Sequence, residues 1–349
     1  MKSNKIRDGR LIRLMGQNWH IVVSAVWIVL FISCGNPRAL GQEAREQFEQ
    51  VLNQHTYSMG TRDGELFGSA VDWIEEKSDR CQFILFGEQH GVAGLPEVVA
   101  AIYSKLRPKG FEHLIFERGP WISRRLSRDG VSETLRRFPH AVAFDYDGEL
   151  RLLRRVELEF RGRGDAFWGI DQSLNAINAL KRLSSVLPTY GSRRAARGLL
   201  LKDALQGGRF LSRDHSRDIE QLRDLAGGAI GDEAKLILDA LAKSQSIFVA
   251  YHNNERTDEG IGVSDVIREQ YMMDQLDQYL AESNLRGEQA PKAVLKMGGA
   301  HVMEGIGPNG VRTLGDHMQN IAEANRLDAL HLSIHSYSAD SNWPESVFD

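Results

Sequence analysis

The stretch Gln82-Phe-Ile-Leu-Phe-Gly-Glu-Gln-His-Gly91 joins a short apolar run to a carboxylate and an imidazole that are flanked by glycines. The apolar run is typical of a buried strand, and the glycines after it let the backbone turn sharply. Glu88 and His90 are two residues apart, so in an extended chain both side chains point to one side. Such a pair at a strand end can bind a metal or act as an acid–base pair on a water molecule.

Two further apolar runs end in polar residues in the same way. Leu114-Ile-Phe is followed by Glu117 and Arg118, and Val294-Leu-Lys-Met is followed by Gly-Gly-Ala-His301. In α/β folds, ligands gather beyond the carboxyl ends of the strands. We therefore expect Glu88, His90, Glu117 and His301 to converge in one pocket.

Apolar runs alternate with amphipathic segments along the rest of the chain, which predicts an α/β fold: a mixed β-sheet with helices on both faces. The segment of about 172–245 reads as wholly helical and is expected to form a cap over the sheet. Strands are predicted at 83–86, 113–116, 141–144, 167–170, 247–251, 293–297 and 330–334. Helices are predicted at 96–106, 149–161, 174–186, 217–225, 233–244, 264–282 and 311–324.

The amino terminus has the pattern of a signal peptide, predicted over residues 1–41. A basic segment precedes an apolar run from Ile21 to Cys34, which spans roughly 21 Å as a helix and falls short of the ~30 Å hydrocarbon core. Cleavage after Gly41 would release a single α/β domain, 42–349. Alternatively, Phe31-Ile-Ser-Cys-Gly35 resembles a bacterial lipobox with Cys34 lipidated. A retained single-pass helix is the third interpretation. The first two predict an exported protein, periplasmic or membrane-anchored, that contacts membrane only through this segment.

Composition excludes several classes of protein. Lys and Arg number 43 against 47 Asp and Glu, so the chain lacks the basic excess of a general nucleic-acid binder. Two cysteines cannot form a disulfide framework, and Cys81 begins a strand-like apolar run, which favours a buried thiol. The patterns G-x-S-x-G, H-E-x-x-H and Walker A are absent from the sequence, which argues against serine hydrolases, zincins and P-loop proteins.

Three more residues are candidates for the walls of the site. Arg118, next to Glu117, could face an anionic substrate group. Asp171 follows the predicted strand 167–170, and His252 follows the predicted strand 247–251. Each could reach the same pocket as Glu88, His90, Glu117 and His301.

The motifs quoted above resemble those of the erythromycin-esterase-like, ChaN-like and TraB/Tiki-like superfamily. Gly87-x-x-His90 and Gly298-x-x-His301 are similar to its paired glycine-histidine motifs, and each follows a predicted strand. The segment that begins at Arg268 is similar to an esterase segment with a site-facing arginine, which implies substrate binding. The first pair is spaced Glu-x-His, closer to the ChaN-like form than to the Glu-x-x-His of the esterases.

What the resemblance implies differs between its branches. Erythromycin esterases open a lactone with a glutamate–histidine centre, Tiki-like members are metal-dependent proteases, and ChaN-like members are exported haem-binding lipoproteins. By position, Glu88, His90, Glu117 and His301 match the site residues, and Glu88, His90 and His301 would be the ligands of a divalent metal. We expect an exported hydrolase that acts on an ester, lactone or amide bond of a small-molecule or peptide substrate. The alternative is a lipoprotein that binds haem or another iron-bearing ligand without catalysis.

Overall fold

A computed structural model of the chain describes residues 20–24, 50, 54–62, 64–90, 94–139 and 146–337. Within these residues, eight strands form one sheet in the order β3-β2-β1-β8-β4-β7-β5-β6. The strands from β8 to β6 are parallel, and β1, β2 and β3 add an antiparallel edge, so the sheet is mixed, as predicted. The strands are β1 (His20–Ser24), β2 (Thr56–Arg62), β3 (Glu65–Phe67), β4 (Cys81–Glu88), β5 (Phe111–Phe116), β6 (Phe167–Gly169), β7 (Lys292–Gly298) and β8 (Asp328–Tyr337).

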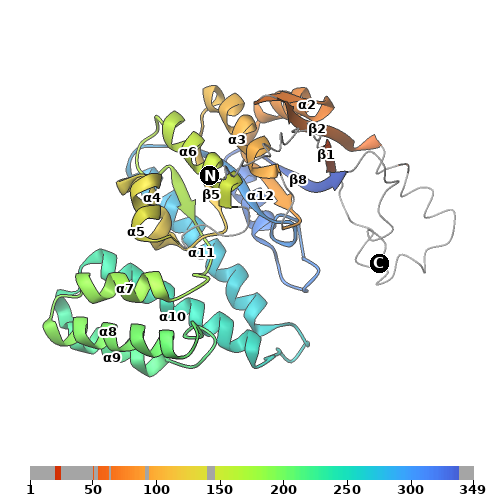
Figure 1. Ribbon diagram of the computed structural model, residues 1–349. Helices are drawn as coiled ribbons and strands as arrows, with labels where there is room; N and C mark the ends of the chain where they lie inside the picture. Colours follow the sequence, from red (N-terminus) through yellow and green to blue (C-terminus); the bar gives the residue numbers. More distant parts are fainter. Residues whose placement is uncertain are drawn as a thin grey trace, which may run out of the picture.

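Helices cover both faces of this sheet, because successive side chains of the buried strands point to opposite faces. In β4, Ile84 and Phe86 pack into one apolar cluster, whereas Phe83 and Leu85 pack into the other. The first cluster is covered by the helices α2 to α6 and the second by α11 and α12 (Figure 1). The helices named so far are α2 (Ser69–Ser78), α3 (Leu95–Leu106), α4 (Pro120–Asp129), α5 (Val131–Arg137), α6 (Tyr146–Glu159), α11 (Val263–Leu285) and α12 (Leu314–Ala324).

The predicted helical cap is present as a group of four helices beside the sheet (Figure 1). It extends past the predicted end near residue 245, and the strand predicted at 247–251 is wrong. That apolar run lies inside the last helix of the group, where Ile247 and Ala250 continue the buried stripe of Leu238 and Leu241 with no glycine or proline to end the helix. The four helices are α7 (Ile177–Val186), α8 (Tyr190–Leu205), α9 (Ser216–Ala226) and α10 (Asp232–His252).

Five of the other six predicted strands are present in the sheet. Those at 83–86, 113–116, 167–170, 293–297 and 330–334 correspond to β4, β5, β6, β7 and β8, and the one at 141–144 lies outside the described residues. The sequence did not predict β2, because Tyr57 and Met59 are the only large apolar residues of Thr56–Arg62 and they do not form a continuous apolar run. Cys81 is buried, and burial raises the pKa of its thiol to about 11, which fits the predicted unreactive role.

The predicted signal peptide is described only in part. His20–Ser24 forms β1, which pairs with β2 and β8, and the remainder of residues 1–41 lies outside the described residues. Among the helices that the structure describes, none combines the length and apolar character needed to span a bilayer. Export therefore stays a prediction.

Candidate active site

Glu88, the last residue of β4, is held by a buried lysine. Lys296 of β7 places Nζ 2.9 Å from each carboxylate oxygen of Glu88 and 2.5 Å from an oxygen of Glu149, in the first turn of α6. All three side chains are more than nine-tenths buried. An ammonium removed from water to this degree needs close anionic partners, and the two glutamates supply them.

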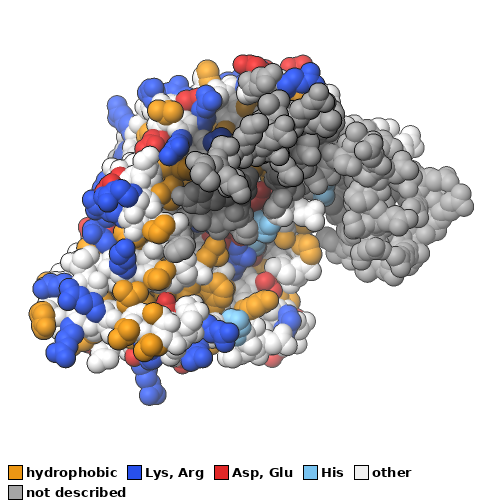
Figure 2. All heavy atoms as spheres, in the orientation of Figure 1, with side chains coloured by type: hydrophobic (Ala, Val, Ile, Leu, Met, Phe, Trp, Pro, Cys, Tyr) orange, Lys and Arg blue, Asp and Glu red, His pale blue; other side chains and the backbone are white. Residues whose placement is uncertain are grey.

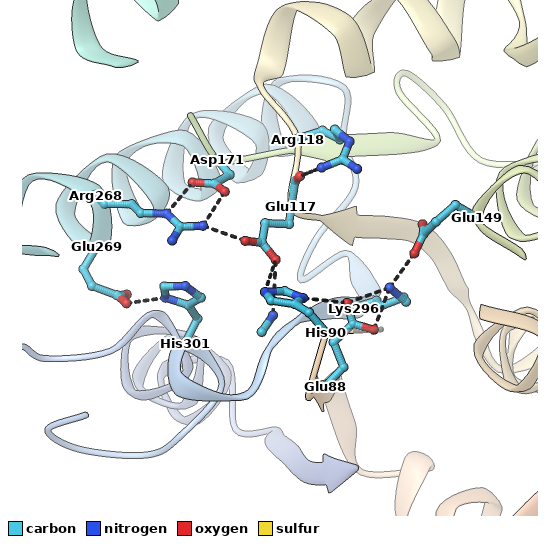
Figure 3. Close-up of polar contacts among 11 residues, drawn as sticks. Glu88, His90, Glu117, Arg118, Glu149, Asp171, Arg268, Glu269, Lys296 and His301 are labelled. Carbon is cyan, nitrogen blue, oxygen red and sulfur yellow. Dashed lines mark hydrogen bonds and ion pairs between the residues drawn. The ribbon is translucent and has the colours of Figure 1, made fainter. Parts of the chain in front are cut away.

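His90 lies between two carboxylates at the mouth of the sheet (Figure 3). Its Nδ1 is 3.3 Å from Oε1 of Glu88, and its Nε2 is 3.7 Å from Oε2 of Glu117. Because 41% of its side chain is exposed, His90 can contact a substrate while the two carboxylates orient its ring. This ring is the most accessible ionisable group of the cluster.

Glu117, just after β5, is itself fixed by an arginine of α11. Arg268 donates to Oε1 of Glu117 at 2.6 Å and to both oxygens of Asp171 at 2.9 and 2.7 Å. Burial opposes the charge on Arg268, but Asp171 and Glu117 outweigh burial and raise its pKa. The backbone N–H of Gly298 donates to the second Glu117 oxygen at 3.3 Å. Arg268 therefore acts here on protein carboxylates, which orients Glu117 toward His90.

His301, in the short turn after β7, has a different partner. Its Nδ1 is 2.5 Å from Glu269 of α11, and the other Glu269 oxygen accepts a hydrogen bond of 2.9 Å from the backbone N–H of Leu314. Glu269 is 2% exposed. This carboxylate joins α11, α12 and the His301 ring.

The two histidines approach each other across Gly298. A Cβ at Gly298 would lie 3.1 Å from Nε2 of His90 and 3.6 Å from Cδ2 of His301. A side chain at this position would crowd the space between the rings, so a glycine keeps it open. Glu88, His90 and Glu117 are thus in contact with one another through His90, and His301 lies on the other side of Gly298 from His90. The chemical roles of all four stay predictions.

The charges around His90 set its protonation. Burial alone would raise the pKa of Glu88, but the hydrogen bond with His90 and the Lys296 ammonium outweigh burial and lower it. The hydrogen bond with Glu88 raises the pKa of His90 above its usual 6.5, with burial opposing the rise and Glu117 adding to it. Glu88 is therefore a weak base that stays ionised, and His90 is the group that can exchange a proton near neutral pH.

The predicted metal ligands do not form a metal site in this arrangement. Among the described residues, no three His, Cys, Asp or Glu side chains are grouped so that they could hold a metal ion. The Lys296 ammonium occupies both oxygens of Glu88, and Glu269 holds His301 on the other side of Gly298. A cation beside Lys296 would be repelled by its charge.

Two predicted substrate-binding residues lie apart from these contacts. Arg118 is buried and donates to the backbone carbonyl of Glu117, and Figure 3 shows its side chain turned away from His90. His252 is exposed in the last turn of α10, where it lines a cavity of ≈ 420 Å³ with Arg256 and Asp265. The prediction that His252 follows a strand is wrong, because the segment 247–251 is helical.

The sequence interpretation missed Lys296, Glu149 and Glu269. A signal for Lys296 existed, because a lysine inside the apolar run of a buried strand needs a partner. Glu149 and Glu269 lie among other charged residues of amphipathic helices, and nothing in their local sequence separates them from solvated ones.

Comparison with known proteins supports the fold. No protein-family model matches the chain, and no curated protein matches it. A mutant of erythromycin esterase EreC in its open conformation matches with a TM-score of 0.50 at 14% identity, over 78% of this chain and 79% of that one. A succinoglycan biosynthesis protein matches with a TM-score of 0.51 at 10% identity, over 86% of this chain and 82% of that one.

At these identities the likeness shows the fold alone. The chain has an α/β fold similar to that of erythromycin esterase EreC, which confirms the predicted fold class.

Proposed function

We propose that the protein is a hydrolase in which His90 activates a water molecule to cleave an ester, lactone or amide bond. The observation that carries this proposal is the position of His90, which is exposed on one edge and lies between the carboxylates of Glu88 and Glu117. Oriented carboxylate–imidazole pairs are the usual means of activating a weak nucleophile at neutral pH. A passive binding site has little need for such a pair.

The contacts support proton transfer by the histidines rather than by Glu88 in the proposed reaction. With Nδ1–H of His90 donated to Glu88, Nε2 carries the lone pair that would accept a proton from water as the oxygen attacks the carbonyl carbon. The resulting imidazolium, stabilised by Glu88 and Glu117, then protonates the departing alcohol or amine. His301, fixed through Nδ1 by Glu269, would in its imidazolium form donate Nε2–H to the carbonyl oxygen or the leaving group.

Activity assays on matched histidine variants test this proposal. The panel is p-nitrophenyl acetate, a macrolide lactone and a peptide amide, and the variant is His90→Gln. We expect the wild type to hydrolyse at least one of these, and the variant to lose about 10²–10⁴-fold in kcat/KM, as for a general base. The matched control is His317→Gln, because His317 also lies 2.8 Å from a carboxylate, Asp277, but outside the site.

Retention of full activity in His90→Gln would overturn the proposal. So would tight binding of haemin, seen in absorption spectra, by a wild type that hydrolyses nothing on the panel. That second outcome would favour the haem-binding alternative. The contacts of His90 and His301 within the part of the chain that the structure describes favour the hydrolase, because they are carboxylates rather than an apolar slot.

We also propose that the protein is exported by way of residues 1–41. The support is the basic segment and the apolar run from Ile21 to Cys34. Cell fractionation with and without globomycin tests it. Accumulation of a precursor under globomycin indicates lipidation of Cys34, and processing after Gly41 indicates ordinary cleavage. Recovery of the intact chain in the cytosol would overturn export.

A further inference from the structure

The outer face of α8 combines exposed leucines with basic residues. Leu201 is 61% exposed and Leu205 is 80% exposed, and both lie on one side of the helix because they are four residues apart. Arg194 and Arg197 extend the same side toward the amino-terminal end of the helix, and both are exposed. Leucines exposed to this degree on adjacent turns form a continuous apolar strip.

Acidic groups are absent from this face within the described helix. The single acid of α8, Asp203, is buried and accepts a hydrogen bond of 2.9 Å from the backbone N–H of Phe210. Beyond the helix, Arg209 and Arg213 are exposed as well. Figure 2 shows Lys and Arg side chains beside apolar ones over this end of the cap.

The position of α8 leaves its outer face free of the sheet. Within the cap, α10 contacts α4 and α11, whereas α8 contacts α7 and α9. Figure 1 places α8 and α9 on the side of the cap that faces away from the sheet. A partner on this face would therefore leave the candidate active site uncovered.

We propose that this face, the α8 outer face (Arg194, Arg197, Leu201 and Leu205), binds the surface of an anionic lipid bilayer. Leucines at this spacing can enter the boundary between headgroups and acyl chains while the arginines pair with lipid phosphates. Charge complementarity selects this partner. A second copy of the chain would bring basic residues against basic residues, which is unfavourable.

Vesicle binding by the full chain tests the proposal. The probes are vesicles of phosphatidylcholine alone and vesicles in which a third of the lipid is phosphatidylglycerol. The variants are Leu201→Ser with Leu205→Ser, and Arg194→Gln with Arg197→Gln. The control is Leu285→Ser, because Leu285 is the most exposed leucine described but lies at the end of α11. We expect each double variant to lower partitioning into the anionic vesicles about tenfold, with the control unchanged.

A local probe removes any contribution of the amino terminus, which all variants share. In a Cys34→Ser background, with Cys81 buried, bimane is attached at Leu201→Cys or at Leu285→Cys. We expect a blue shift on anionic vesicles at the first position only, and its loss in high salt.

Three outcomes would overturn the proposal: equal shifts at both positions, equal binding to anionic vesicles by the wild type and all variants, or concentration-dependent dimerisation that the leucine variant abolishes. The last would assign the face to a second copy. Hydrolysis of a soluble ester by the leucine variant should be unchanged, so this test does not depend on the proposed activity.

Discussion

The two glycine-histidine segments have the same short pattern but place their histidines in unlike surroundings. His90 is 41% exposed and contacts two carboxylates, one of which is neutralised by the buried Lys296. His301 is 12% exposed and contacts a single buried carboxylate, whose other oxygen is fixed by the backbone of α12. The first ring is part of a charge network, and the second is part of the helix packing.

This difference indicates a division of labour. The protonation of His90 responds to the Glu88 and Lys296 charges beneath it, whereas the orientation of His301 responds to how α11 and α12 pack. Changes on the His90 side should therefore alter the pH dependence of activity. Changes on the His301 side should alter its rate without moving that dependence.

The largest expected effect is on stability, from Lys296→Met. Removing this ammonium leaves Glu88 and Glu149 buried without their cation, and breaking a buried ion pair in this way costs about 3–5 kcal/mol. Urea denaturation followed by circular dichroism measures the loss. The control is Lys105→Met, whose pair with Glu75 at 2.8 Å is exposed and should contribute about 0–1 kcal/mol.

A double variant makes the stability prediction sharper. Lys296→Met with Glu149→Gln removes one charge of each sign and should recover part of the loss. Equal stability of Lys296→Met and the wild type would show that the buried network does not hold the His90 side together.

The next effect is on the His301 side, from Glu269→Gln. Glutamine has one carbonyl oxygen, so it cannot accept from both Nδ1 of His301 and the N–H of Leu314. Loss of one charge-assisted buried hydrogen bond should cost about 1.5–3 kcal/mol, and kcat/KM should fall about 10–100-fold. Rate measurements across a pH range should show the same apparent pKa as the wild type. A shifted pKa would contradict the proposed division of labour.

The strand-end half of the site could be predicted from the sequence, and its charge network could not. An apolar run precedes each of Glu88, His90, Glu117 and His301. Because ligands gather beyond the carboxyl ends of the strands in α/β folds, this local pattern predicts that the four residues lie near one another. The pairing of Glu88 with Lys296 depends on the register that sets Phe86 beside Lys296, and no local pattern fixes the neighbour of a strand.

The same limit explains the errors in secondary structure. Five apolar residues at 247–251 fit a buried strand as well as one turn of a buried helix, and only the uninterrupted pattern from Asp232 decides between them. Because this segment belongs to α10, His252 does not follow a strand, and the reason for expecting it at the site no longer holds.

A smaller effect concerns the pH dependence of activity. A general base must be neutral, and the hydrogen bond with Glu88 raises the pKa of His90 above 6.5. We therefore expect kcat/KM to rise with pH through an apparent pKa above 6.5. Glu88→Gln removes the largest cause of the raised pKa and should move this limb to lower pH. Asp277→Asn, which removes the partner of His317, should leave the limb in place. If the pH dependence of kcat/KM is the same in Glu88→Gln as in the wild type, Glu88 does not set the pKa of His90.

The smallest expected effect is the contribution of the Glu88–His90 contact to stability. The raised pKa of His90 means that this contribution is fully present below the unfolded pKa of about 6.5 and is lost as the pH rises through the folded value. The lowered pKa of Glu88 means that it is present above about 4.5 and is lost as the pH falls through the folded value. Both conditions hold together between about pH 4.5 and 6.5. Because His90 is partly exposed, solvent screening limits the difference in unfolding free energy between the wild type and His90→Gln to about 1 kcal/mol or less. Urea denaturation at a series of pH values should show this difference at its maximum inside that window and shrinking above it. A difference that grows toward pH 9 would mean that His90 stabilises the fold in its neutral form. The raised pKa of His90 would then no longer distinguish it from His301.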